Sequence, residues 1–143
     1  AGVRIIYAGI GGNTSREGLA RLEPDVLRYR PDITVVCFGL NDVHGGDAGL
    51  GAYQDCLREI FRALIESGCG IECNTNRGNV PLPDAPLLKL YRETGGEIIT
   101  IGSDAHSAEY VGCRVRETQA LLRTCGFRYF CTFEGGKPTF RKL

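Results

Sequence analysis

Short apolar runs alternate with helical segments along the whole chain, and this alternation most constrains the fold. The apolar runs cover residues 3–10, 32–40, 69–75 and 97–106, and residues 127–133 begin a closing strand with a hairpin return. The segments between them have the apolar spacing of helices and tend to end at glycine. Such alternation produces parallel strands joined by right-handed crossovers. We therefore expect one α/β domain over residues 1–143, with about five mainly parallel strands alternating with four helices.

The expected helices lie at residues 15–30, 53–68, 85–95 and 107–126, the last capped by Ser107. We expect a kink or break at Pro24, because proline in a helix interior removes a hydrogen bond and clashes with the preceding turn. Residues 41–52 are expected to form a loop. Five parallel strands suit an open three-layer (flavodoxin-like) sandwich or half of a barrel. We favour the sandwich, because an isolated half-barrel exposes two long strand edges.

Composition excludes several classes of partner. The 17 basic and 17 acidic residues give zero net charge, so the basic surplus needed to bind nucleic acid or anionic membrane is missing. The seven cysteines form no C-x-x-C pair, and we interpret those in apolar runs (Cys37, Cys73 and Cys131) as buried, reduced thiols. No apolar stretch approaches the roughly 20 residues that span a bilayer. The start has no signal-peptide pattern, so we expect a cytoplasmic protein.

Polar residues follow each expected strand, at the edge where parallel α/β proteins bind ligands. Four clusters of this kind occur: Gly11-Gly12-Asn13, Asn41-Asp42-Val43-His44, Glu72 with Asn74, and Asp104-Ala105-His106. Both histidines of the chain are among them. We therefore expect the four clusters to share one rim of the sheet.

Each cluster has a functional and a structural interpretation. Gly12 lies in a glycine-rich turn whose N–H groups can bind an anion, or which is merely tight. Asn41 can donate to an oxyanion, or it can cap the local backbone together with Asp42. Asp104 and His106 would point to the same face of a strand, as a pair of metal ligands. The alternative for this pair is a helix cap beside an exposed histidine.

Residues from about 1 to 50 resemble the SGNH, or GDSL-type, hydrolases. The resemblance rests on IIYAGIGGNTSREG and on the G-x-N-D block within CFGLNDVHGGD. It implies that Gly12 and Asn41 are the oxyanion donors. The nucleophilic serine of that family stands in a G-D-S block on a preceding strand, which this sequence does not contain, and the family's D-x-x-H block is also missing.

Residues from about 53 to 143 resemble the C-terminal part of the PHP-family histidinol-phosphatases. The resemblance rests on REIFRALIESGCGIECNTN, LLKLYRETGGEIITIGSDAHSAEYVG and LLRTCGFRYFCTFEGGKPTF. It implies hydrolysis of phosphate monoesters with divalent metals in a distorted barrel. Asp104 and His106 would be metal ligands, with Glu72 and Asn74 on a strand that approaches the same site. The H-x-H motif and the remaining ligands of the family have no counterpart here.

Two partial resemblances with neither catalytic set complete predict a recombined or engineered chimera without evolved catalytic activity, joined in or just before residues 53–68. Two alternatives stay open. One is a metal-dependent phosphoric monoester hydrolase, in which Asp42 and His44 join Asp104 and His106 around Zn, Mn or Fe. The other is a metal- or anion-binding module on the same rim. The partner that we expect is a second copy, bound through a sheet edge or a mismatched core face.

Overall fold

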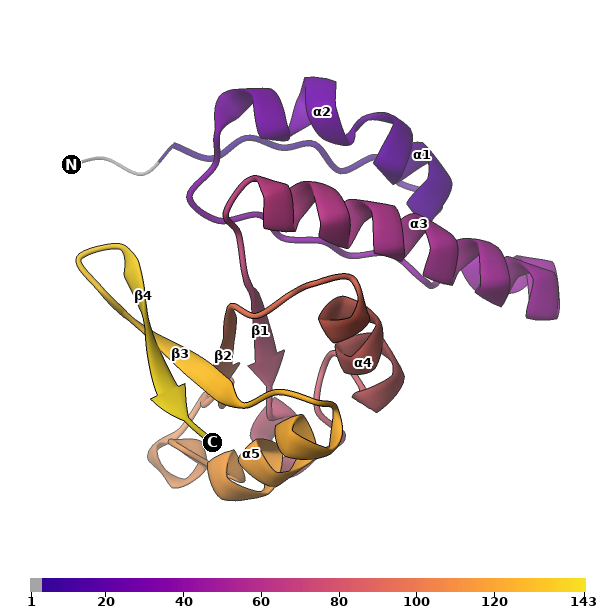
Figure 1. The fold of residues 1–143 in the computed structure, drawn as a ribbon. Helices are drawn as coiled ribbons and strands as arrows, with labels where there is room; N and C mark the ends of the chain where they lie inside the picture. The colour runs from indigo at the N-terminus through magenta and orange to yellow at the C-terminus, as the bar shows by residue number, and fades with distance from the viewer. Residues whose placement is uncertain (1–3) are drawn as a thin grey trace. The chain divides into compact units, whose positions relative to one another are not determined.

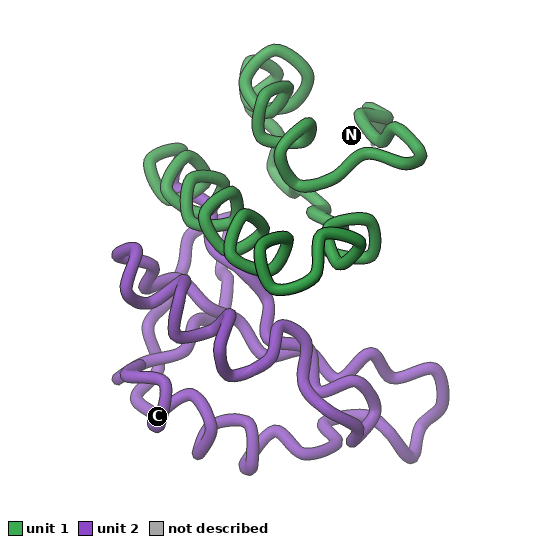
Figure 2. Tube along the Cα trace, turned by 90° about the vertical axis from the view of Figure 1, so that its right-hand side faces the viewer, with its two compact units in different colours: residues 1–67 green, residues 68–143 purple. Residues whose placement is uncertain are grey.

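The computed structural model describes residues 4–143 and divides into two compact units, residues 1–67 and 68–143 (Figures 1 and 2). The boundary lies at the C-terminal end of a long helix, whereas the join was expected in or just before residues 53–68. That the two units fold as one domain stays a prediction. No helix within residues 4–143 combines the length and apolar character that crossing a bilayer requires.

The first unit is helical. Its first expected helix is broken into α1 (Ser15–Ala20), α2 (Leu22–Asp25) and the 3-10 turn η1 (Leu27–Tyr29). The break predicted from Pro24 is confirmed, but it falls at Arg21 and Val26, and Pro24 itself lies within α2. The expectation of a loop over residues 41–52 is wrong, because the 3-10 turn η2 (Asp42–Gly45) leads directly into α3 (Gly46–Glu66). The buried side chains of α3 recur at helical spacing and cover one face: Cys56, Leu57, Ile60, Phe61 and Leu64.

The strands expected at residues 3–10 and 32–40 are not formed in the part of the chain that is described, and residue 3 lies outside it. Residues 4–10 and 32–38 have no strand partner, and most of their large apolar side chains are exposed. A strand exists only where a neighbouring strand satisfies its backbone groups. The prediction of about five mainly parallel strands is therefore not confirmed, although the α/β class is.

The second unit holds all of the strand pairing found in residues 4–143 (Figure 1). β1 (Ile71–Asn74) pairs in parallel with β2 (Ile99–Gly102), and the 3-10 turn η3 (Asn76–Gly78) and helix α4 (Ala85–Glu93) connect them. The predicted terminal hairpin is confirmed as β3 (Tyr129–Glu134) and β4 (Lys137–Lys142). Gly135 and Gly136 turn it with positive φ angles, which two-residue hairpin turns require.

The last helix is shorter than expected. The 3-10 turn η4 (Ala108–Tyr110) replaces its first part, and α5 spans Val115–Thr124, so the prediction of a continuous helix capped by Ser107 is wrong. Gly112 and Arg114 both have positive φ, which no helix interior accepts. The helical periodicity of the sequence therefore begins before the backbone becomes helical.

The core of the second unit forms around Tyr91 of α4. Its ring stacks on Phe127 with centroids 6.3 Å apart, and its hydroxyl donates to the carbonyl of Ile98 at 2.9 Å. A Cβ at position 96 would lie 2.3 Å from this ring, so the close approach requires Gly96. The remaining fully buried apolar side chains are Cys73, Leu88, Ile99 and Leu122. Cys73 and Cys131 are buried as predicted, whereas Cys37 is exposed.

A matched pair of leucines tests this core. Leu88 is 0% exposed and Leu82 is 58% exposed in the same unit. We expect Leu88→Ala to lower the free energy of unfolding by about 2–5 kcal/mol, because a cavity replaces packed atoms. Leu82→Ala should cost less than about 1 kcal/mol. Urea titration followed by circular dichroism measures both, and equal losses would contradict the assigned core.

Alkaline pH should destabilise the same core. Burial raises the pKa of the Cys73 thiol from 9.0 to about 11 and that of the Tyr91 hydroxyl from 10.0 to about 12. Both groups keep their protons in the folded chain at a pH where the unfolded chain has released them. The free energy of unfolding should therefore be level below pH 9 and fall as the pH rises towards 12. Urea titrations at successive pH values measure this, and a level profile up to pH 11 would contradict it.

Candidate functional site

Two of the four predicted polar clusters meet at the carboxyl ends of β1 and β2 in the second unit. Glu72 and Asn74 lie on β1, and the amide of Asn74 donates to the Glu72 carboxylate at 3.3 Å. The Glu72 carboxylate lies over Gly102 of β2, where a Cβ would come within 2.6 Å of its Cδ. Glycine at the end of β2 thus leaves room for an acidic side chain on β1.

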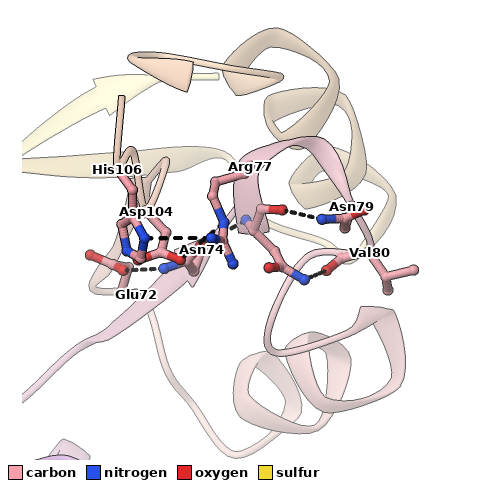
Figure 3. A network of polar contacts seen from close by, with 8 residues as sticks. Glu72, Asn74, Arg77, Asn79, Val80, Asp104 and His106 are labelled. Carbon is pink, nitrogen blue, oxygen red and sulfur yellow. Dashed lines mark hydrogen bonds and ion pairs between the residues drawn. The ribbon is translucent and has the colours of Figure 1, made fainter. Parts of the chain in front are cut away.

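Asp104 and His106 converge just beyond β2 (Figure 3). The Asp104 Oδ1 and His106 Nε2 atoms are 3.3 Å apart, and both side chains are open to solvent. The convergence was predicted from strand geometry, but β2 ends at Gly102 and Asp104 has a φ of +51°. A left-handed turn, which aspartate tolerates better than most residues, therefore brings the pair together.

Arg77 completes this cluster, although the sequence pattern does not predict it. Its Nε lies 3.6 Å from Asp104 Oδ2 and its Nη1 lies 3.5 Å from His106 Nδ1 (Figure 3). The Arg77 guanidinium can donate to Nδ1 when the imidazole has its proton on Nε2, and a metal ion bound at Nε2 requires the other tautomer. We call Arg77, Asp104 and His106 the Arg–Asp–His cluster.

The loop after β1 positions Arg77 through local hydrogen bonds. The side-chain oxygen of Asn74 accepts from the backbone N–H of Asn76 at 2.7 Å, and the Asn76 amide donates to the carbonyl of Val80 at 3.2 Å. Asn76 and Arg77 both have positive φ angles. The sequence signal for this turn was the run of asparagines and glycine around Arg77, which favours left-handed backbone but does not indicate the direction of the arginine.

Asp104 and His106 of the Arg–Asp–His cluster have the separation of two metal ligands. Ligand atoms about 2.1 Å from a zinc ion at the tetrahedral angle lie about 3.4 Å apart, close to the separation of Asp104 Oδ1 and His106 Nε2. Across residues 4–143, however, no three His, Cys, Asp or Glu side chains converge as a group that could hold a metal ion. Protein zinc sites use three or four such ligands. Asp104 and His106 therefore fit two positions of a divalent ion and no more.

In the first unit, the Asp42 carboxylate accepts hydrogen bonds from backbone N–H groups. It accepts from the Ser15 N–H at 3.0 Å and from the Ser15 hydroxyl at 2.6 Å, and it also accepts from the Gly39 N–H at 3.1 Å. Ser15 is 1% exposed and begins α1. The carboxylate thus compensates free N–H groups at a helix start, which is the structural interpretation of this cluster. His44 lies nearby in the sequence, on η2, and is exposed.

Gly12 and Asn41 are brought close together through Asn13. Gly12 has a φ of +82° in an exposed turn, and the Asn41 amide donates to the carbonyl of Asn13 at 2.9 Å. Arg21 donates to the side-chain oxygen of Asn13 at 2.8 Å and holds the turn from the other side. The predicted oxyanion donors are therefore neighbours, while the hydroxyl of Ser15 is engaged by Asp42.

Comparison with known proteins finds both predicted resemblances. Residues 1–132 match the family model described as GDSL-like Lipase/Acylhydrolase. The acetylxylan esterase of Geobacillus stearothermophilus is 45% identical over 42 residues, which cover 29% of this chain and 19% of that enzyme. The protein of Thermotoga maritima named "Probable histidinol-phosphatase" is 31% identical over 99 residues, covering 67% of this chain and 42% of its own length.

A solved structure shows the same fold. The crystal structure of the Lactococcus lactis histidinol phosphate phosphatase, complexed with zinc, L-histidinol and phosphate, has a TM-score of 0.58 at 23% identity. The match covers 94% of this chain and 54% of that one. The present chain spans less than half the length of the curated histidinol-phosphatases, with 42% of the Thermotoga maritima protein and 34% of the Clostridium acetobutylicum protein matched.

Removal of the Asp42 carboxylate should loosen the first unit. Asp42→Ala leaves the N–H groups of Ser15 and Gly39 without their acceptor, and we expect a loss of about 2 kcal/mol in the free energy of unfolding. Amide hydrogen exchange in α1 should accelerate in parallel. Asp55→Ala is the control, because the Asp55 side chain is 80% exposed and pairs only with an exposed arginine. Unchanged exchange in α1 of the Asp42 variant would contradict the assignment.

Proposed function

The chain belongs to the GDSL-like lipase/acylhydrolase family, and we propose that its chemistry nevertheless lies in the second unit, as a divalent-metal- and phosphate-binding module without turnover of its own. The observation that carries the proposal is the approach of Asp104 Oδ1 to His106 Nε2 at 3.3 Å. The relatives named histidinol-phosphatase support this chemical class. An esterase centre has less support, since Ser15 donates its hydroxyl to Asp42.

Metal and phosphate binding should be coupled through Arg77. The Arg77 guanidinium forms an ion pair with the Asp104 carboxylate at 3.6 Å. The same carboxylate is a candidate metal ligand. When Asp104 binds a divalent cation, Arg77 loses this partner, and its planar donors suit the oxygens of a phosphate group. The cluster therefore favours a cation and a phosphate anion together over either one alone.

Turnover makes greater demands on a site than binding does. A metal-dependent phosphatase must activate water and stabilise the leaving group, and both tasks require a firmly held ion. Within the described residues, Asp104 and His106 offer two ligand positions. We expect binding weaker than that of a three- or four-ligand site, and hydrolysis no faster than that caused by the free metal ion.

The two histidines of the chain provide a matched test. Adding Zn²⁺ should shift the ring NMR signals of His106 and leave those of His44 unchanged, and calorimetry should give one weak site. Asp104→Ala and His106→Ala should each abolish the heat of Zn²⁺ binding, whereas His44→Ala should leave it unchanged. Inorganic phosphate should bind more tightly in the presence of Zn²⁺, and Arg77→Gln should remove this gain.

Three results would contradict the proposal. Zinc binding that survives Asp104→Ala would place the metal elsewhere. Zinc binding lost in His44→Ala would favour the alternative in which Asp42 and His44 contribute ligands. Hydrolysis of p-nitrophenyl phosphate above the free-metal rate, lost in both Asp104→Ala and His106→Ala, would establish a phosphatase instead of a binding module.

A further inference from the structure

Residues 4–10 and 32–38 of the first unit have the sequences of buried strands but are exposed. We call them the unpaired segments. In the first segment Ile5 and Tyr7 are 68% and 91% exposed, and Ile6 between them is 42% exposed. In the second, Ile33 and Val35 are 83% and 87% exposed, whereas Thr34 between them is half-buried and Val36 after them is 37% exposed. This alternation is that of strands with one face turned to solvent. Two apolar faces of this kind are costly in water and mark an interaction surface.

The backbone of the unpaired segments is also open. In the described part of the chain, the carbonyl of Ile10 accepts from Asn13 and the carbonyl of Ala8 accepts from Arg21. Among residues 4–143, no hydrogen bond between backbone groups is found that involves residues 32–38. A row of free N–H and C=O groups binds another strand better than any other partner. The occupant of this surface must therefore be a β-strand with apolar side chains.

We propose that a second copy of the chain supplies this strand, with residues 4–10 of one copy pairing with residues 32–38 of the other. Each copy contains both unpaired segments. A two-fold symmetric dimer therefore gives each of the four segments a strand partner. The zero net charge of the chain opposes such association less than a charged surface would. The proposal concerns the first unit alone and is independent of the function proposed for the second.

The charges of the unpaired segments select a parallel register. Arg4 is the one charged residue of residues 4–10, and Asp32 is the one charged residue of residues 32–38. Parallel pairing places Arg4 beside Asp32 and Tyr7 beside Val35. Antiparallel pairing places both charges against apolar side chains. Opposite charges on neighbouring strands stabilise a pairing, and like charges weaken it.

Charge-reversal variants distinguish strand pairing between two copies from strand pairing within one chain. In sedimentation equilibrium, Arg4→Asp alone and Asp32→Arg alone should each weaken the dimer about tenfold, because every pair then has like charges. A 1:1 mixture of the two variants should restore dimerisation, since each mixed dimer again has only opposite charges. Pairing within one chain cannot be rescued in this way. A mixture no tighter than the single variants would overturn the proposal.

A second pair of variants tests the surface itself. Val35→Lys should abolish the dimer, whereas Val111→Lys, at a valine of the second unit that is 72% exposed, should leave it unchanged. At concentrations where the wild-type chain is monomeric, circular dichroism should be the same for both variants, because neither side chain is buried in a single copy. A wild-type chain that stays monomeric at all concentrations, or that forms a ladder of larger species insensitive to Val35→Lys, would also refute strand exchange.

Discussion

Parallel pairing of β1 with β2 is the interaction on which the second unit depends. It aligns Ile71 with Ile99 and Asn74 with Gly102, so one end of the pair enters the core and the other forms a polar edge. Cys73 and Ile99 are completely buried. Because β1 and β2 are parallel, the segments that follow them leave the sheet at the same edge. These two segments contain the residues of the Arg–Asp–His cluster. The geometry of the candidate site is thus a consequence of strand direction.

The first unit shows what happens to strand-like sequence without a partner. Residues 32–38 are more apolar than β1, yet they remain unpaired and expose Ile33 and Val35. Hydrogen bonds from Ser15 and Gly39 to Asp42 organise the chain around them. A carboxylate at a helix start can fix a loop, but it does not replace the ladder of hydrogen bonds that makes a strand.

The candidate site was predictable in its residue types and only partly in its geometry. Asp104 and His106 were identified because a carboxylate and an imidazole two residues apart follow an apolar run. Their approach was predicted correctly, but for a strand that in fact ends before them. Arg77 was not predicted, since its place depends on consecutive left-handed residues and on the amide of Asn74. Such turns depend on contacts that a linear pattern does not encode.

The sequence by itself determined that the helix around Pro24 is broken, that the chain ends in a hairpin with a glycine turn, and which two families the chain resembles. Each follows from local chemistry: a missing N–H, a positive φ, or a run of adjacent residues. Only the tertiary structure decided which apolar runs become strands, and which polar clusters meet. A strand requires a neighbour across space, and apolar sequence supplies the tendency to be buried without supplying the partner.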